Sequence, residues 1–342
     1  MNKSKKIKVL VVDDSLVFRE VLSRGISSDP DLEVVAVAND AFDARDKIIE
    51  YEPDVMTCDV EMPKMNGIEF IKRLMPQYPL PIIVVSSISN IVFDAMNAGA
   101  VDFIAKPDMH YAGGLKAFIN ELNAKIKTAS TANLSHWKNN EIPPKNIGRA
   151  NVGASRALIA IGASTGGTEA IYSILQRLPE SVPGIVVVQH IPPVFSRMYA
   201  ERLNSTTWFQ AKEAETGDFI ESGRVLVAPG DKHMRIKKAG DKYKVECFKG
   251  EKVSGHCPSV DVLFESVAKE AGREAIGIIL TGMGYDGAKG LLSMRKNGAR
   301  TIGQDEKSSV VYGMPKVAYS IGAVERQASL DDIPGIIFSM LG

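Results

Sequence analysis

Ser164, His190 and Asp286 are of the residue types that form a nucleophile, a general base and an orienting acid. The serine lies in GASTG, a G-x-S-x-G pattern whose small residues permit a sharp strand-to-helix turn that exposes the hydroxyl. His190 follows the apolar run GIVVVQ, and Asp286 comes shortly after the run AIGIIL. A histidine beside the hydroxyl can take its proton, and a buried carboxylate fixes the imidazole tautomer. The three residues predict acyl transfer through a covalent intermediate.

The sequence also leaves alternatives for these residues. Glycine-rich turns bind phosphate or dinucleotides, as in an oxidoreductase, although Ser164 occupies the second glycine position of the G-x-G-x-x-G fingerprint. Asp305 also follows an apolar run and is the second candidate for the acid. His233 and His256 lie in predicted loops and are candidates to line the substrate cleft. The histidines lack the spacing of a zinc motif.

A second group of polar residues follows apolar runs in the first third of the chain: Asp13, Asp14, Asp59, Ser86 and Lys106. The carboxyl ends of parallel strands share one edge of a sheet, so these side chains are expected to converge. Three crowded carboxylates repel one another and need a cation, and hard oxygen ligands suit Mg²⁺. With a hydroxyl and a lysine beside them, they predict a site at which a carboxylate accepts a phosphoryl group.

The elements that must position these residues alternate between β-branched runs and helical patterns, which predicts parallel, doubly wound sheets. In the first part, strands are expected at 8–12, 33–38, 55–58, 81–85 and 103–105, and helices at 15–27, 41–50, 67–77, 91–98 and 114–127. In the second part, strands are expected at 157–161, 184–189, 224–228, 275–280 and 301–304, helices at 167–178 and 288–296, and a β-hairpin insertion at 234–248. We expect two α/β domains, 1–127 and 156–342, joined by a linker at 128–155.

The composition excludes several classes of protein. Lys+Arg and Asp+Glu both number 41, so the formal charge is zero, which argues against nucleic-acid binding through bulk charge. No apolar run approaches the roughly 18 residues of a membrane span, and the start of the sequence lacks a signal-peptide pattern. The three cysteines form no C-x-x-C pair. We expect a cytoplasmic protein without membrane insertion.

Residues 7–125 resemble the receiver domain of two-component response regulators. The resemblance implies a flavodoxin-like fold in which Asp59 accepts a phosphoryl group from a histidine kinase and the three acids hold Mg²⁺. It also implies a cis peptide bond before Pro107. The residues it assigns to phosphoryl contact and switching are Ser86, Lys106 and Phe103.

Residues 156–342 resemble the catalytic domain of the chemotaxis protein-glutamate methylesterases. The matching segments are IGASTGG, VVVQHIP, APGDKHM, GHCPSVDVLF, ILTGMGYDGAKGL and QDEKSSVVYGMP. The resemblance implies a Rossmann-like domain in which Ser164 is the nucleophile, His190 the base and Asp286 the acid. By the same resemblance, Thr165 and Met283 contribute to the oxyanion hole.

The combined resemblance implies a phosphorylation-regulated esterase without a cofactor in the ester chemistry. Its substrates would be glutamate methyl esters, and also glutamines, on the cytoplasmic helices of methyl-accepting chemotaxis receptors, and a chemotaxis histidine kinase would phosphorylate it. Thr168, Cys257 and Tyr285 depart from the family pattern, which concerns substrate contacts rather than chemistry. The alternative is a non-enzymatic response regulator whose second domain binds a partner.

Overall fold

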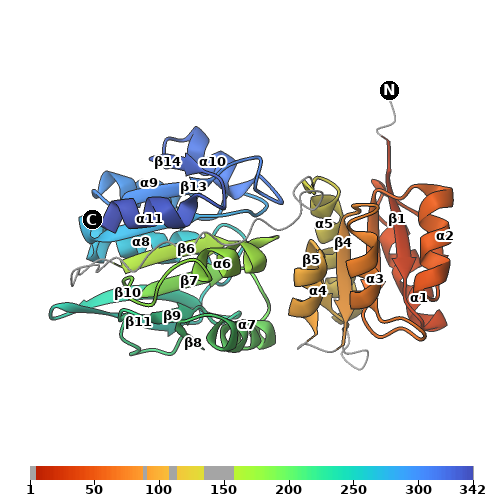
Figure 1. Cartoon of the computed structure of the whole chain (residues 1–342), viewed down its shortest axis with the longest axis horizontal. Helices are drawn as coiled ribbons and strands as arrows, with labels where there is room; N and C mark the ends of the chain where they lie inside the picture. Colours follow the sequence, from red (N-terminus) through yellow and green to blue (C-terminus); the bar gives the residue numbers. More distant parts are fainter. Residues whose placement is uncertain (1–4, 88–90, 108–113, 135–157, 342) are drawn as a thin grey trace. The chain divides into compact units, whose positions relative to one another are not determined.

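The computed structural model describes residues 5–87, 91–107, 114–134 and 158–341. The chain divides into two compact units, Met1–Asn140 and Glu141–Gly342 (Figure 1). The helix that was expected to end at residue 127 runs on through Ala129, and Thr128 and Ala129 are both buried. Most of the expected linker lies outside the described residues, so its boundaries stay a prediction.

The first unit is built on a parallel five-stranded sheet with the order β2-β1-β3-β4-β5. Its strands are β1 (Ile7–Val12), β2 (Leu32–Ala38), β3 (Val55–Asp59), β4 (Ile82–Ser86) and β5 (Asp102–Ala105). Every residue of β3 and β4 is buried, which is the property of central strands covered on both faces. The sheet therefore brings the ends of β1, β3, β4 and β5 to one edge.

Helices alternate with these strands, as the sequence pattern predicts. They are α1 (Leu16–Ser27), α2 (Ala41–Tyr51), α3 (Gly67–Leu74), α4 (Val92–Ala98) and α5 (Gly114–Ala129). Ser15, Asp40 and Asn66 cap the first three, each accepting a main-chain N–H bond from the first turn. The caps fix where each chain segment turns from a strand edge into its helix.

The second unit contains a parallel seven-stranded sheet with the order β14-β13-β12-β6-β7-β9-β8. Its strands are β6 (Leu158–Ala163), β7 (Ile185–Gln189), β8 (Gln210–Glu213), β9 (Arg224–Val227), β12 (Ala275–Ile279), β13 (Arg300–Gln304) and β14 (Arg326–Ala328). Strands β12, β6 and β7 are neighbours at its centre. The strands that precede Asp286, Ser164 and His190 therefore end side by side.

Helices and one antiparallel hairpin complete the second unit (Figure 1). The helices are α6 (Gly167–Leu175), α7 (Pro193–Thr206), α8 (Val260–Glu270), α9 (Ala288–Lys296), α10 (Met314–Ser320) and α11 (Ile333–Leu341), with a 3₁₀ turn at Gly272–Glu274. The hairpin pairs β10 (His233–Ala239) with β11 (Lys242–Phe248) through Gly240, whose φ of 68° lies in the left-handed region. Met234 and Tyr243 of the hairpin share a core with Phe264 of α8.

The two doubly wound parallel sheets and the hairpin insertion confirm the predicted fold class. Strands β8 and β14 were not predicted, and neither were the helices α7, α8, α10 and α11. Both missed strands are at the edges of the sheet, and each has only one buried residue. Such strands lack the continuous apolar run by which a central parallel strand is identified.

Candidate functional site

Ser164 lies in the sharp turn between β6 and α6. Its carbonyl accepts a 2.7 Å hydrogen bond from Gly167 N, and Gly166 between them has a φ of 76°. Its own N–H donates at 3.0 Å to the carbonyl of Thr281, two residues beyond the end of β12. The serine is half-buried. The turn therefore places the hydroxyl beside the first turn of α6, where main-chain N–H groups point outward.

Gly162 allows α8 to approach this turn. A Cβ atom at residue 162 would lie 2.2 Å from Cγ1 of Val260, the first residue of α8. The glycine thus has a packing role that is separate from the flexibility of the turn.

Replacing Gly162 by alanine is expected to lower the free energy of unfolding by about 1–3 kcal/mol, the usual effect of overpacking a core. Urea unfolding measures this change. Gly335 in α11 is the matched control, because a Cβ there has nothing within 4 Å, and its replacement by alanine should be neutral or stabilising by up to about 1 kcal/mol. Equal destabilisation in the two variants would contradict the packing argument.

His190 follows β7, the neighbour of β6. Ala163 pairs with Gln189, and His190 N donates to the Ala163 carbonyl at 3.2 Å, so Ser164 and His190 are the next residues on adjacent strands. The imidazole Nε2 lies 2.8 Å from Oδ2 of Asp286. An ionised carboxylate can only accept, so this contact assigns the proton to Nε2. Nδ1 is buried without a hydrogen-bond partner in the described part of the chain, and its lone pair is therefore available.

Asp286 is 1% exposed and accepts from several donors besides the histidine. Ser259 Oγ and Asp261 N donate to Oδ1 at 2.7 and 3.0 Å, and Val260 N donates to Oδ2 at 2.7 Å. Burial alone would raise the pKa of Asp286, but the contact with His190 and the bonds from the start of α8 together lower it. The carboxylate is therefore ionised and held in a fixed orientation.

The two predicted oxyanion-hole residues flank Ser164 on different segments. Thr165 follows the serine and is buried, and its carbonyl accepts from Thr281 Oγ1 at 3.0 Å. Met283 has a 51% exposed side chain and lies in the loop after β12. The adjacent Gly282 approaches Ser164 so closely that an added Cβ would lie 2.6 Å from the serine Cβ. The loop therefore brings the main chain before Met283 against the serine.

The other candidate residues take different places. Asp305 Oδ1 accepts from Ser308 N and Oγ, so this acid stabilises its own loop, while Asp286 contacts His190. His233 is 1% exposed and uses both ring nitrogens, with Nε2 2.8 Å from the Glu251 carbonyl and Nδ1 3.2 Å from Ser259 N. The expectation that His233 lines the cleft is wrong, because these bonds bury it. His256 lies directly against the His190 ring.

Ser259, whose hydroxyl donates to Asp286 Oδ1, is not among the residues predicted from the sequence. A signal was available, since a Ser-Val-Asp segment before an apolar helical pattern is typical of a helix start. The partner of that hydroxyl, however, is 27 residues away in the chain. The sequence around a helix-capping serine is the same whether its hydroxyl bonds to its own helix or to a distant acid. The local pattern therefore does not reveal the contact with Asp286.

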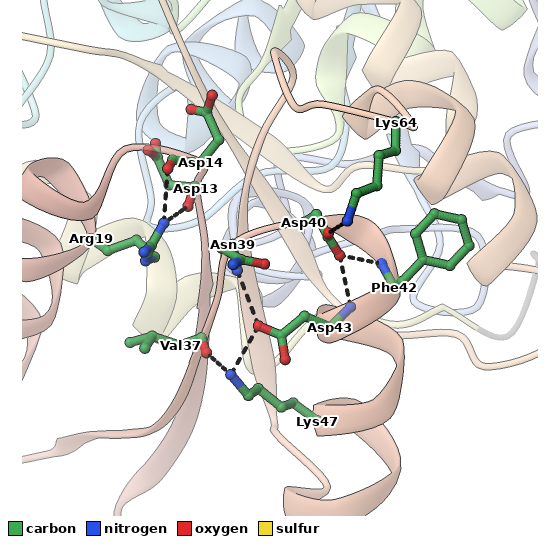
Figure 2. Close-up of polar contacts among 10 residues, drawn as sticks. All are labelled: Asp13, Asp14, Arg19, Val37, Asn39, Asp40, Phe42, Asp43, Lys47 and Lys64. Carbon is green, nitrogen blue, oxygen red and sulfur yellow. Dashed lines mark hydrogen bonds and ion pairs between the residues drawn. The ribbon is translucent and has the colours of Figure 1, made fainter.

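In the first unit, Asp13, Asp14 and Asp59 converge as predicted, with carboxylate oxygens within 4.8 Å of one another. Lys106 Nζ lies 2.6 Å from Asp59 Oδ2 and 2.8 Å from Asp13 Oδ2. Figure 2 shows Arg19 donating to the main-chain carbonyls of Asp13 and Asp14 at 2.6 and 3.0 Å, which fixes the loop that presents both acids.

Burial and charge oppose each other in this acidic cluster. Burial raises the pKa of Asp13, and the nearby Lys106 only partly offsets it. The ion pairs with Asp13 and Asp59 raise the pKa of Lys106 despite its burial. Asp13 Oδ2 is buried, and within the described residues it has the Lys106 ion pair but no hydrogen bond of good geometry. The cluster thus retains acceptor capacity.

Two further predicted residues of this unit, Ser86 and Phe103, lie in the neighbouring strands β4 and β5. Ser86 ends β4 and is buried, and its carbonyl accepts from Lys106 N at 3.0 Å. Phe103 is buried, with its ring centroid 6.0 Å from that of Phe93. The expectation of a cis bond before Pro107 is wrong: in the described residues, the cis peptide bond is Cys257–Pro258.

Two comparisons of the sequence with known families cover most of the chain. A family profile described as CheB methylesterase matches residues 159–337, and one described as response regulator receiver domain matches residues 9–111. Among the helices described, none combines the length and the apolar character that a membrane crossing requires.

Named relatives extend over nearly the whole chain. A protein-glutamate methylesterase/protein-glutamine glutaminase 2 of Syntrophomonas wolfei subsp. wolfei is 59% identical over 338 residues, 98% of each chain. A protein-glutamate methylesterase/protein-glutamine glutaminase of Syntrophotalea carbinolica is 52% identical over 346 residues, again 98% of each. The crystal structure of the Thermotoga maritima CheB methylesterase catalytic domain, 36% identical, superposes with a TM-score of 0.53 and covers 54% of this chain and 98% of its own.

Proposed function

The chain belongs to the family of protein-glutamate methylesterases/protein-glutamine glutaminases that carry a receiver domain, and we propose that Ser164, His190 and Asp286 perform its hydrolysis. The protein is a chemotaxis methylesterase and glutaminase, with a receiver domain that fits regulation by phosphorylation. The non-enzymatic and oxidoreductase alternatives are therefore set aside. The observation that carries the proposed site is the buried His190–Asp286 pair, which leaves Nδ1 available at the strand position next to Ser164.

His190 Nδ1 moves the proton in each step of the proposed hydrolysis. His190 Nδ1 takes the proton of Ser164 Oγ as the oxygen bonds to the carbonyl carbon of the substrate side chain. Main-chain N–H groups of Thr165 and Met283 stabilise the resulting oxyanion. The carbon–oxygen bond then breaks, and methanol leaves with the proton from Nδ1. A water molecule then gives a proton to the same nitrogen as it attacks the acyl carbon. The bond from that carbon to Ser164 Oγ breaks, Oγ takes the proton back from Nδ1, and glutamate is released.

Deamidation uses the same sequence of bonds with a different leaving group. When the substrate is a glutamine, the carbon–nitrogen bond of the tetrahedral intermediate breaks and ammonia leaves with the proton from Nδ1. Asp286 remains ionised throughout and stabilises the transient imidazolium. A single site therefore performs both reactions.

The family to which the chain belongs indicates the partners. The substrates are glutamate methyl esters and glutamines on the cytoplasmic helices of chemotaxis receptors, so the enzyme acts in the cytoplasm beside a membrane. A chemotaxis histidine kinase supplies the phosphoryl group to Asp59, the buried acid at the end of β3.

The acidic cluster fits a divalent cation. Three carboxylates offer hard oxygen ligands within 4.8 Å of one another, and Asp13 Oδ2 is a buried oxygen with acceptor capacity left. Asp13, Asp14 and Asp59 would hold Mg²⁺, which would offset negative charge on the carboxylates and the phosphoryl group. Lys106 already lies against Asp59 and holds that carboxylate in place.

Covalent labelling tests the proposed nucleophile directly. A fluorophosphonate probe should modify Ser164, located by peptide mass spectrometry, and a methylated receptor fragment should slow the labelling. Modification elsewhere with Ser164 unlabelled would reject the assignment.

The receiver site makes a second prediction. A small-molecule phosphodonor with Mg²⁺ should raise methanol release by the full-length enzyme about 5- to 150-fold, the usual range of coupling between two sites. Asp59→Asn should abolish this increase, and so should a chelator, because the acceptor or the cation is lost.

Asp46→Asn is the matched control, since Asp46 is an exposed acid of the same unit. Its activation by the phosphodonor should equal that of the wild type. Activation that persists in Asp59→Asn would contradict the role of Asp59.

A further inference from the structure

His256 stacks on the imidazole of His190. The two ring centroids are 3.7 Å apart and the ring planes differ by 8°. Parallel rings at this separation are in face-to-face contact, so one face of the His190 imidazole is covered. Because the rings are parallel, His256 contacts the face of His190 and not the edge that carries the nitrogens.

The segment that carries His256, which we call the strap (Val253–Asp261), is fixed by its own hydrogen bonds. Val253 and His256 exchange two main-chain bonds of 3.0 Å across a tight turn. The two residues inside it, Ser254 and Gly255, have φ values of 51° and 86°, as such a turn requires. Ser254 Oγ donates to Asp261 Oδ2 at 2.8 Å and ties the turn to the start of α8.

The far end of the strap holds the acid. Ser259, Val260 and Asp261 supply the donors that orient Asp286. Asp261 in turn accepts from Gly290 N at 2.8 Å, which joins the strap to α9. The base and the acid that contacts it are therefore attached to one short, well-anchored segment.

His190 needs such support because its ring has few polar contacts. Nε2 is bonded to Asp286, and Nδ1 has no partner in the described residues. A ring held through one nitrogen can still tilt about its Cβ–Cγ bond, which would move Nδ1 away from the serine. A flat surface 3.7 Å away opposes this rotation.

On this basis we propose that His256 is a positioning residue for His190: its ring holds the imidazole in the plane from which Nδ1 takes the proton of Ser164. The inference rests on the proposed function, since it assumes that His190 is the base. It requires an aromatic surface at residue 256 and no proton transfer by His256 itself.

The test compares two variants in the full-length enzyme with a methylated receptor fragment. His256→Ala should lower kcat about 10- to 100-fold, the effect of a small misplacement of a catalytic group. KM should change less than about 2-fold, because the ring positions the base and does not bind substrate. Labelling of Ser164 by a fluorophosphonate should slow in parallel with kcat.

Conservative rescue separates stacking from other roles. His256→Phe keeps a flat ring and should restore kcat to within about 3-fold of the wild type, because a Phe ring also presents a flat aromatic face to the imidazole. Lys252→Ala, at an exposed position just before the strap, is the control and should match the wild type. Thermal unfolding of each variant reports any loss of fold.

The proposal is overturned if His256→Ala keeps the kcat of the wild type, if its loss is in KM alone, or if His256→Phe is as slow as His256→Ala. A low kcat in His256→Ala that Phe restores supports it. If Ser164→Ala were still active, the proposed function itself would fail, whatever the result at residue 256.

Discussion

Ser164→Ala is expected to lower the rate of methanol release from methylated receptor by about 10⁴- to 10⁶-fold, the range seen when a triad nucleophile is removed. The variant keeps the turn but has no oxygen to form the acyl-enzyme. Ser164 is half-buried, and the bonds that hold the turn are made by its main-chain N–H and C=O groups, which alanine keeps. The fold of the variant should therefore be unchanged. Ammonia release from receptor glutamines should fall by the same factor.

Ser205→Ala is the matched control for this variant. Ser205 is exposed on α7 and its hydroxyl donates only to the Arg202 carbonyl at 3.0 Å. Its activity should equal that of the wild type. Substantial methanol release by Ser164→Ala would show that another group is the nucleophile.

Asp286→Asn should have the second-largest effect, a fall in kcat of about 10⁴-fold. An amide NH₂ facing His190 would donate to Nε2 and shift the ring proton to Nδ1, the nitrogen that must accept from Ser164. The same NH₂ would face the Val260 N–H, which donates to Oδ2 in the wild type. Two donors then oppose each other in a buried site, which should destabilise the fold by about 1–3 kcal/mol.

The matched control is Asp305→Asn, which changes the second candidate for the orienting acid. Among the described residues, the hydrogen-bond partner of its carboxylate is Ser308 in its own loop, so kcat should stay within about 2-fold of the wild type, as is usual for changes away from the reacting groups. A larger loss in Asp305→Asn than in Asp286→Asn would reverse the assignment of the acid.

The stability effect of Asp286→Asn should depend on pH. The folded state holds the pKa of Asp286 below its ordinary value of 3.8, so the ionised carboxylate stabilises the fold above that pH and loses this contribution as the pH falls through the lower folded pKa. The difference in unfolding free energy between wild type and variant should therefore be largest near neutral pH and shrink below pH 3.8. Urea unfolding at several pH values measures it.

The sequence predicted the residues that follow central strands better than those in loops. Ser164 and His190 come directly after buried apolar runs, and parallel strands leave their next residues at one edge. Asp13 and Asp59 follow the same rule in the first unit. In these cases the pattern that specifies the sheet also specifies the site.

Loop residues required the structure. His233 and His256 looked equivalent in the sequence, yet His233 is buried with both nitrogens bonded and His256 stacks on the His190 ring. The preference for Asp286 over Asp305 was already made from the sequence, and the contact of Asp286 with His190, 96 residues away in the chain, supports it. Spacing does not encode which nitrogen of His190 meets the acid, because that depends on where α8 begins in space.

Because Nε2 of His190 contacts Asp286, the nitrogen that faces the proton transfer in the proposed site is Nδ1. Nδ1 is the ring nitrogen closer to the main chain, so a given rotation about the Cα–Cβ bond displaces it less than it would displace Nε2. In the proposed site, the backbone of β7 therefore helps to set the position of Nδ1, while the stacked ring of His256 opposes tilting of the imidazole. Buried residues of this strand, such as Val188, contribute to that position without contacting a reacting atom.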